Sequence, residues 1–236
     1  MKIEYSDFYP EEKKKSDKDI HPWVYYVLRP LSFRISIIIS KIGVSANRVT
    51  ILGGLILLSS FYFLLATNAD NIAIDTIIFA LLMNFWYFLD VVDGNIARIN
   101  LMSSNDTLPK GGINGKLLDS TFGYIQIVYV PLIVGFSIYS ADIENLEFYL
   151  YVGFLASFFS SLRIYLKKSI DDTCTNFDEM SILNRFGYVI LSSMLPILLL
   201  FSILSLVEWW VLLNLFLSFA SFLIVAFSAF TVTCKK

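Results

Sequence analysis

Two aspartates stand three residues apart near the end of a long apolar segment, in the sequence FLDVVDGNIARIN. In a helix Asp90 and Asp93 lie on one face, and Gly94 and Ala97 continue that face. Acids are rare in membrane helices and usually functional, because each Asp near the bilayer centre costs roughly 2.5–3.5 kcal/mol on insertion scales. A divalent cation would offset this cost and the mutual repulsion, since carboxylate oxygen is a ligand that Mg²⁺ prefers.

A third acid opens the next apolar segment, in the sequence GKLLDSTFGY. Gly115, Asp119 and Gly123 follow one another at four-residue intervals and therefore share one stripe of a helix. A single loop joins this segment to the previous one, so the two helices run antiparallel and all three acids are expected at one depth. Arg98 lies one turn beyond the first acidic pair and adds a fixed positive charge suited to a diphosphate.

The composition indicates that lipid surrounds the elements that carry these acids. Of the 236 residues, 56% are hydrophobic and only 16% are charged, whereas soluble domains carry about 25% charge. We expect an all-α polytopic membrane protein, because only helices satisfy the backbone over such long apolar runs. Nothing predicts a nucleic-acid partner. The six predicted membrane helices lie near residues 49–67, 73–92, 117–139, 146–166, 183–206 and 208–231.

The chain before the first span divides into two parts. Residues 1–20 predict a polar cytoplasmic N-terminus. Residues 21–42 predict a juxtamembrane amphipathic helix in the membrane interface, with its Trp, Tyr and Ile facing lipid and its Arg facing water. The alternative is a short helix packed on the bundle. Residues 43–236 then form one six-helix transmembrane domain.

The positive charges predict the orientation of the six spans. All 18 Lys and Arg fall in the N-terminal segment, the second and fourth interhelical loops, the adjoining helix ends or the C-terminal tail. With six spans these segments lie on one side of the membrane. The positive-inside rule makes that side cytoplasmic, so both termini and the three acids are expected there.

The acidic motif resembles the signature of the CDP-alcohol phosphotransferase (CDP-alcohol phosphatidyltransferase) family. That signature reads Asp-x-x-Asp-Gly-x-x-Ala-Arg, followed by Gly-x-x-x-Asp-x-x-x-Asp. The matching positions are Asp90, Asp93, Gly94, Ala97, Arg98, Gly115 and Asp119. The segment GVSANRVTILGG, with Asn47 and Thr50, is similar to the family's Pro-Asn-x-x-Thr start of the first span, although Ala46 replaces the proline.

The resemblance implies a transferase of phospholipid or related phosphodiester biosynthesis. Such an enzyme moves a phospho-alcohol group from a CDP-alcohol to an acceptor hydroxyl and releases CMP. The donor is CDP-diacylglycerol or a soluble CDP-alcohol, and both remain open. The implied partners are this donor, the acceptor alcohol and membrane lipid, and a homodimer is compatible with the resemblance. The implied metal ligands for Mg²⁺ or Mn²⁺ are Asp90, Asp93 and Asp119, of which Asp119 is also the catalytic candidate. The implied donor-binding residues are Asn47, Thr50, Gly94, Ala97, Arg98 and Gly115.

The chain departs from the family pattern at the fourth acid, where it has Gly123. In the family this residue is the proposed general base, and losing such assistance costs about 10²–10⁴-fold in rate. Three alternatives follow. Another acid or a metal-bound water acts as base, the acceptor is acidic enough to need little help, or the protein is a catalytically silent relative that binds a CDP-alcohol or metal.

Two further segments are ambiguous. Residues 99–114 are 16 residues long, about twice the usual family spacing, and their Pro and Gly content predicts a surface loop. Arg163, near the end of the fourth span, is expected to bind a phosphate of the donor or acceptor. The alternative for Arg163 is an anchor that reaches lipid headgroups.

Overall fold

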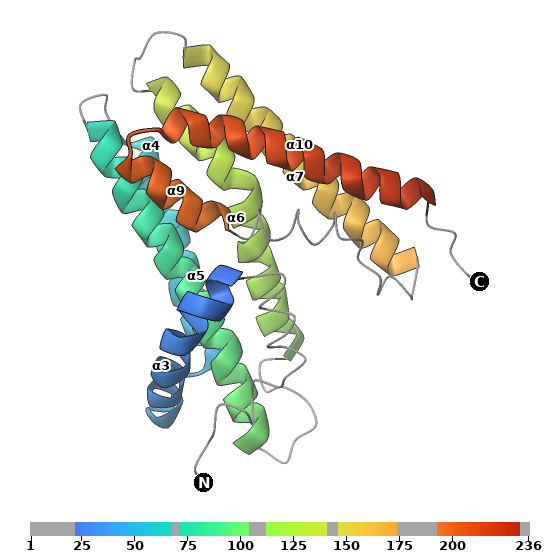
Figure 1. Ribbon diagram of the computed structural model, residues 1–236. Coiled ribbons are helices and arrows are strands. Elements are labelled where there is room, and N and C mark those ends of the chain that lie inside the picture. The colour runs from blue at the N-terminus through green and yellow to red at the C-terminus, as the bar shows by residue number, and fades with distance from the viewer. Residues whose placement is uncertain (1–21, 68–70, 104–111, 141–145, 174–192, 232–236) are drawn as a thin grey trace. The chain divides into compact units, whose positions relative to one another are not determined.

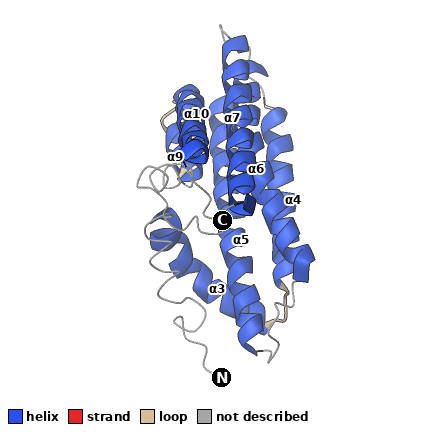
Figure 2. Ribbon diagram, turned by 90° about the vertical axis from the view of Figure 1, so that its right-hand side faces the viewer, coloured by secondary structure: helices blue, strands red, loops and turns tan. Residues whose placement is uncertain are grey.

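The computed structural model describes residues 22–67, 71–103, 112–140, 146–173 and 193–231 (Figure 1). Every regular element within these ranges is a helix, which Figure 2 shows from a second side. The elements are η1 (Val24–Leu28), α3 (Arg29–Lys41), α4 (Ala46–Leu65), α5 (Ile72–Ser103), α6 (Gly112–Ser140), α7 (Leu146–Thr173), α9 (Met194–Ile203) and α10 (Val207–Thr231). The predicted all-α class is therefore confirmed over the described residues.

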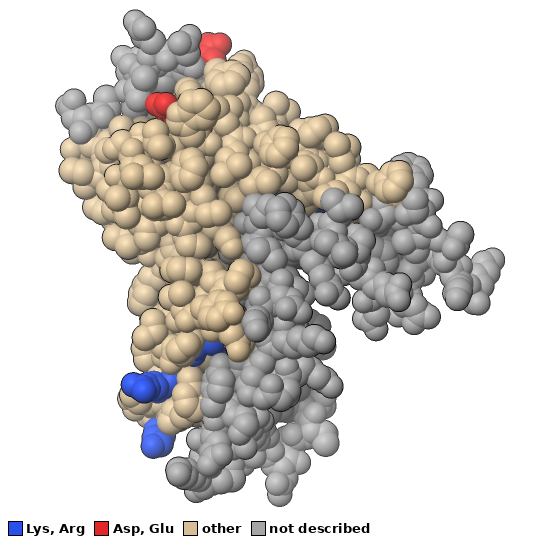
Figure 3. Space-filling model, in the orientation of Figure 1, with Lys and Arg blue, Asp and Glu red and all other residues tan. Residues whose placement is uncertain are grey.

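Five of these helices are long and apolar enough to cross a membrane, namely α4, α5, α6, α7 and α10. Many of their large apolar side chains are exposed, as expected where lipid rather than protein covers a helix. The face in Figure 3 is correspondingly almost free of charged side chains over its described surface. These properties are those of an integral membrane protein.

The fifth predicted span, residues 183–206, is described only from residue 193 onward. There α9 covers Met194–Ile203, which is shorter than the roughly 20 residues that cross a bilayer. Residues 183–192 lie outside the described ranges, so the count of six spans stays a prediction. The turn after α9 places Ser205 in the left-handed region, with φ 57°.

The second span is longer than the sequence predicted. Helix α5 runs to Ser103, so the acidic motif lies inside the helix rather than at its end. The prediction of a surface loop over 99–114 is wrong at both ends, because α6 already begins at Gly112. The reason is visible at Ile99, which is 3% exposed and continues the buried face of α5. Residues 104–111 lie outside the described ranges.

The helices divide into two compact units. The first contains residues 1–60 and 81–124, and the second contains residues 61–80 and 125–236. Helices α4, α5 and α6 each contribute a segment to both units. The three acids and the described residues that line their pocket belong to the first unit.

In the first unit the core forms where α4 and η1 pack on α5. Val49 of α4 is buried against three residues of α5, one helical turn or less apart: Leu89, Val92 and Ile96. Val24 and Leu28 of η1 are buried against Val91, which directly precedes Val92 on α5. The acid-bearing stretch of α5 is therefore held by apolar contacts on two sides.

Helix α3 buries a polar face rather than an apolar one. Its buried residues are Arg29, Ser32 and Ser36, whereas Leu31 and Ile38 are exposed. The prediction that the arginines of this helix face water is therefore wrong for Arg29, although Arg34 is exposed. The physical reason is that α5 offers polar partners to this face. The position of α3 in the membrane interface stays a prediction.

In the second unit α6 and α7 meet at two glycines. A Cβ on Gly135 would lie 2.5 Å from the carbonyl oxygen of Tyr149, and one on Gly153 would lie 2.6 Å from that of Pro131. Small residues of this kind allow membrane helices to approach closely. Helices α7 and α10 also run along one another (Figure 1).

Candidate functional site

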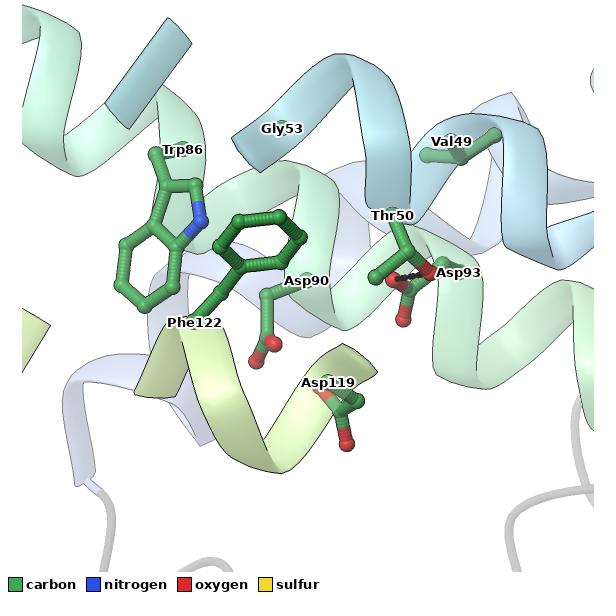
Figure 4. A pocket seen from close by; sticks show the side chains of 8 residues that line it. All are labelled: Val49, Thr50, Gly53, Trp86, Asp90, Asp93, Asp119 and Phe122. Carbon is green, nitrogen blue, oxygen red and sulfur yellow. Dashed lines mark hydrogen bonds between the residues drawn. The ribbon is translucent and has the colours of Figure 1, made fainter. Parts of the chain in front are cut away.

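Three carboxylates converge in the first unit. Asp90 and Asp93 project from α5 and Asp119 from α6, and one oxygen of each lies within 4.8 Å of the others. Figure 4 shows the three side chains directed into one pocket. The convergence predicted from helix spacing is therefore confirmed. The acids differ in exposure, since Asp93 is 6% exposed, Asp90 is partly buried and Asp119 is exposed.

Thr50 fixes the most buried of these acids. Its Oγ1 donates to Oδ2 of Asp93 at 2.5 Å and also lies 3.1 Å from the carbonyl oxygen of Ala46 (Figure 4). The residue lies within the first two turns of α4. Through Thr50, α4 orients a carboxylate of α5, which is a direct structural role for this motif residue.

Asn47 and Gly115 contact one another across α4 and α6. A Cβ on Gly115 would lie 2.7 Å from Oδ1 of Asn47, closer than such contacts normally come. Glycine at this position therefore lets the start of α6 approach α4. Since Asp119 lies one turn further along α6, this contact helps to set its position. Whether either residue contacts a nucleotide stays a prediction.

Aromatic side chains enclose the acids on the side opposite Thr50. The pocket is lined by Val49, Thr50, Gly53, Trp86, Asp90, Asp93, Asp119 and Phe122. Its volume of about 10 Å³ is close to the minimum that holds one water molecule. The ring of Phe122 fills the space that a Cβ on Gly54 would need.

The two aromatic residues were missed by sequence reasoning, although the signal was present. Trp86 precedes Asp90 by four positions and Phe122 follows Asp119 by three, so each shares a helix face with an acid. The adjacent pair Gly53 and Gly54 also indicated close packing on α4. Their apolar neighbours made these residues look like ordinary membrane-helix positions.

Arg98 lies beside the acids but points back along α5. Its guanidinium comes within 3.7 Å of the position that a Cβ on Gly94 would take, and its Nη1 donates to Oδ1 of Asn95 at 3.2 Å. Gly94 and Ala97 are both partly buried next to it. Arg29 of α3 donates to the same oxygen of Asn95. Neither Asn95 nor Arg29 was identified from the sequence as a site residue, because only the fold brings α3 to α5.

Two other predicted positions have clear surroundings. Arg163 is 8% exposed in the second unit, and its Nη1 donates to Oγ of Ser221 at 3.2 Å between α7 and α10. It is therefore buried in protein rather than extended as a surface anchor, and its phosphate-binding role stays a prediction.

At Gly123 a Cβ would meet open space, since no neighbouring atom of the described residues lies within 4 Å of its place.

No family model matches the chain, and no curated protein matches it significantly. The assignment to a class of protein therefore depends on the motif residues and on the geometry that they adopt.

Proposed function

We propose that this protein is a membrane-embedded transferase that moves a phospho-alcohol group from a CDP-alcohol to an acceptor hydroxyl and releases CMP. The observation that carries the proposal is the convergence of Asp90, Asp93 and Asp119 within 4.8 Å, from two helices. Arg98 adds a cation on the same stretch of α5. This combination suits a ligand that contains both a divalent cation and a diphosphate.

The donor set fits Mg²⁺ or Mn²⁺. Three carboxylates close together repel one another, and a bound divalent ion offsets that repulsion. Asp90, Asp93 and Asp119 would hold the ion, and the pocket of about 10 Å³ is of a suitable size for one small ligand. When bound, such an ion neutralises charge on the attacking and leaving oxygens of a phosphoryl transfer.

The protein side chains would supply orientation, charge and proton transfer. Thr50 holds the carboxylate of Asp93 in one orientation. Arg98 would bind the anionic diphosphate. Asp119, the exposed acid, would accept the proton of the acceptor hydroxyl, since Gly123 cannot. Because the pocket is too small for a nucleotide, the donor would lie on the exposed side of Asp119.

The proposal includes a topology. Six spans with the site and both termini on the cytoplasmic side agree with the distribution of all 18 Lys and Arg. Among the described residues of the first unit, the exposed basic ones are Arg34, Lys41 and Arg48, which follow the same pattern around α3 and the start of α4. Helix α3 would then lie at the cytoplasmic interface.

A second candidate function has a specific observation in its favour. Gly123 stands at the position where the family that the motif resembles has its proposed general base. A catalytically silent protein that binds a CDP-alcohol or metal would retain Asp90, Asp93, Asp119 and Arg98 without that acid. This alternative predicts binding without turnover.

The test is CMP release by the purified protein from a panel of CDP-alcohols with Mg²⁺ or Mn²⁺. Release that is lost in Asp119→Asn and retained in Asp75→Asn supports the enzyme. Asp75 is a suitable control, because it is an acid of α5 that accepts a hydrogen bond from Thr67 outside the cluster. Absence of release from every donor, together with a gain in Gly123→Asp, would establish the silent alternative.

A further inference from the structure

Arg29 is a buried cation at the junction of α3 and α5. The residue begins α3 and is only 6% exposed. Its Nη1 donates to Oδ1 of Asn95 at 2.7 Å, across 66 positions of sequence. Removing a guanidinium from solvent is costly unless charge and hydrogen bonds compensate it. Arg29 therefore needs the environment that this stretch of α5 provides.

Asn95 joins this cation to the proposed site. Its Oδ1 also accepts a hydrogen bond from Nη1 of Arg98 at 3.2 Å, and its Nδ2 donates to Oγ of Ser32 at 3.0 Å. With the amide oxygen directed at two guanidiniums and the amide nitrogen at a hydroxyl, only one orientation of the Asn95 side chain fits. The side chain is 1% exposed, so water does not replace these partners.

The two arginines also bring positive charge to the acidic stretch of α5. Both guanidiniums donate to Oδ1 of Asn95, which lies two residues beyond Asp93 on that helix. Ser36 strengthens the attachment of the same helix, because its Oγ lies 3.3 Å from the carbonyl oxygen of Val92. Helix α3 thus contacts α5 between Val92 and Asn95, the stretch that contains Asp93.

We propose that Arg29 is a positioning residue of the site, which holds Arg98 through Asn95 and supplies countercharge to the acid cluster. Helix α3 then helps to position Arg98, the residue proposed to bind the anion, and is more than a membrane attachment. The identity of the anion as a nucleotide diphosphate rests on the proposed function. The countercharge role requires only that the three acids bind a divalent cation, and not that the anion is a nucleotide.

The test compares cation and anion binding in the purified full-length protein. Mn²⁺ affinity is measured by the loss of the free-ion electron paramagnetic resonance signal, and CDP affinity by calorimetry at saturating Mn²⁺. In Arg29→Gln we expect Mn²⁺ to bind more tightly, because a nearby positive charge is removed. We expect CDP to bind about tenfold more weakly, because Asn95 loses its Arg29 partner and no longer holds Arg98 in place for a charge-assisted contact. Arg34→Gln, an exposed arginine of the same helix, should change neither affinity.

A second variant separates charge from geometry and covers the case in which Arg29→Gln does not fold. Arg29→Lys keeps the charge but loses the planar fork. It should bind Mn²⁺ like the wild type and CDP several-fold more weakly. An equal loss of both affinities in either folded variant, or unchanged affinities in both, would overturn the proposal.

The two proposals fail in different ways. If the wild type binds Mn²⁺ but neither binds CDP nor releases CMP, the proposed function fails, while tighter Mn²⁺ binding in Arg29→Gln still supports the countercharge. If the wild type binds neither probe, both proposals are overturned.

Discussion

The hydroxyl of Thr50 lies 2.5 Å from Oδ2 of Asp93 and joins α4 to the acidic motif of α5. Asp93 is the most buried of the three clustered acids, so its orientation depends on protein partners rather than on water. Thr50 lies 43 positions away in sequence and reaches it from a different helix. The hydrogen bond therefore makes the packing of α4 a determinant of the geometry of the acid cluster.

Replacing Thr50 by Val should weaken metal binding by about 10–100-fold, which is typical when a partner of a metal ligand is lost. Val has nearly the same shape, so the substitution removes the donor and leaves the packing. Mn²⁺ affinity measured by electron paramagnetic resonance tests this expectation. Thr50→Ser keeps the hydroxyl and is the matched control. Equal affinities in the Val and Ser variants would contradict the role assigned to the hydroxyl.

Two glycines in the first unit should respond in opposite ways to alanine. In Gly54→Ala the new methyl group collides with the ring of Phe122, so stability should fall by about 1–3 kcal/mol. In Gly123→Ala the methyl group meets open space, and stability should rise by about 0.5–1 kcal/mol because Ala favours the helix. Thermal unfolding in detergent measures both.

The collision at Gly54 can be tested by removing its other partner. The double variant Gly54→Ala with Phe122→Ala should be less destabilised than the sum of the two single variants. Additive losses would mean that the new methyl group and the ring do not interact. Glycine at position 54 would then not be what allows the ring to lie beside the acids. The single variant Phe122→Ala is the reference for the loss of the ring itself.

Gly123→Asp should restore a fourth acid without loss of stability. The space around this position accommodates a Cβ, and Asp119 lies one turn away on the same helix. An added carboxylate on this stripe should strengthen Mn²⁺ binding, since the ligand set gains charge. Gly123→Asn, which is similar in size but uncharged, is the control. A folded Gly123→Asp variant that binds Mn²⁺ no better than Gly123→Asn would show that position 123 does not reach the metal.

Helix spacing was sufficient to predict which acids meet. Asp90 and Asp93 share a face because they are three residues apart, and one loop brings Asp119 to the same end of the neighbouring helix. The length of the apolar runs also predicted α4 and α10 to within a few residues. These features depend on local sequence, which is why they could be predicted.

Contacts between distant segments could not be predicted in the same way. Arg29 was expected to face water because arginines of amphipathic helices usually do, yet Asn95 gives it a buried partner 66 positions away. The extension of α5 to Ser103 was not predicted, because the polar residues, proline and glycines after Ser103 favoured a loop over the whole of 99–114. In both cases tertiary contacts on one helix face outweighed the local composition.

The glycine contact between α6 and α7 gives the last prediction. In Gly153→Ala the new methyl group would lie 2.6 Å from the carbonyl oxygen of Pro131, which is backbone and cannot rotate away. The helices must separate, so stability should fall by about 1–3 kcal/mol even though Ala is the better helix former. Gly123→Ala introduces the same group on α6 without a neighbour and is the control for helix propensity. If Gly153→Ala unfolds at the same temperature as Gly123→Ala, the two helices do not depend on this close approach.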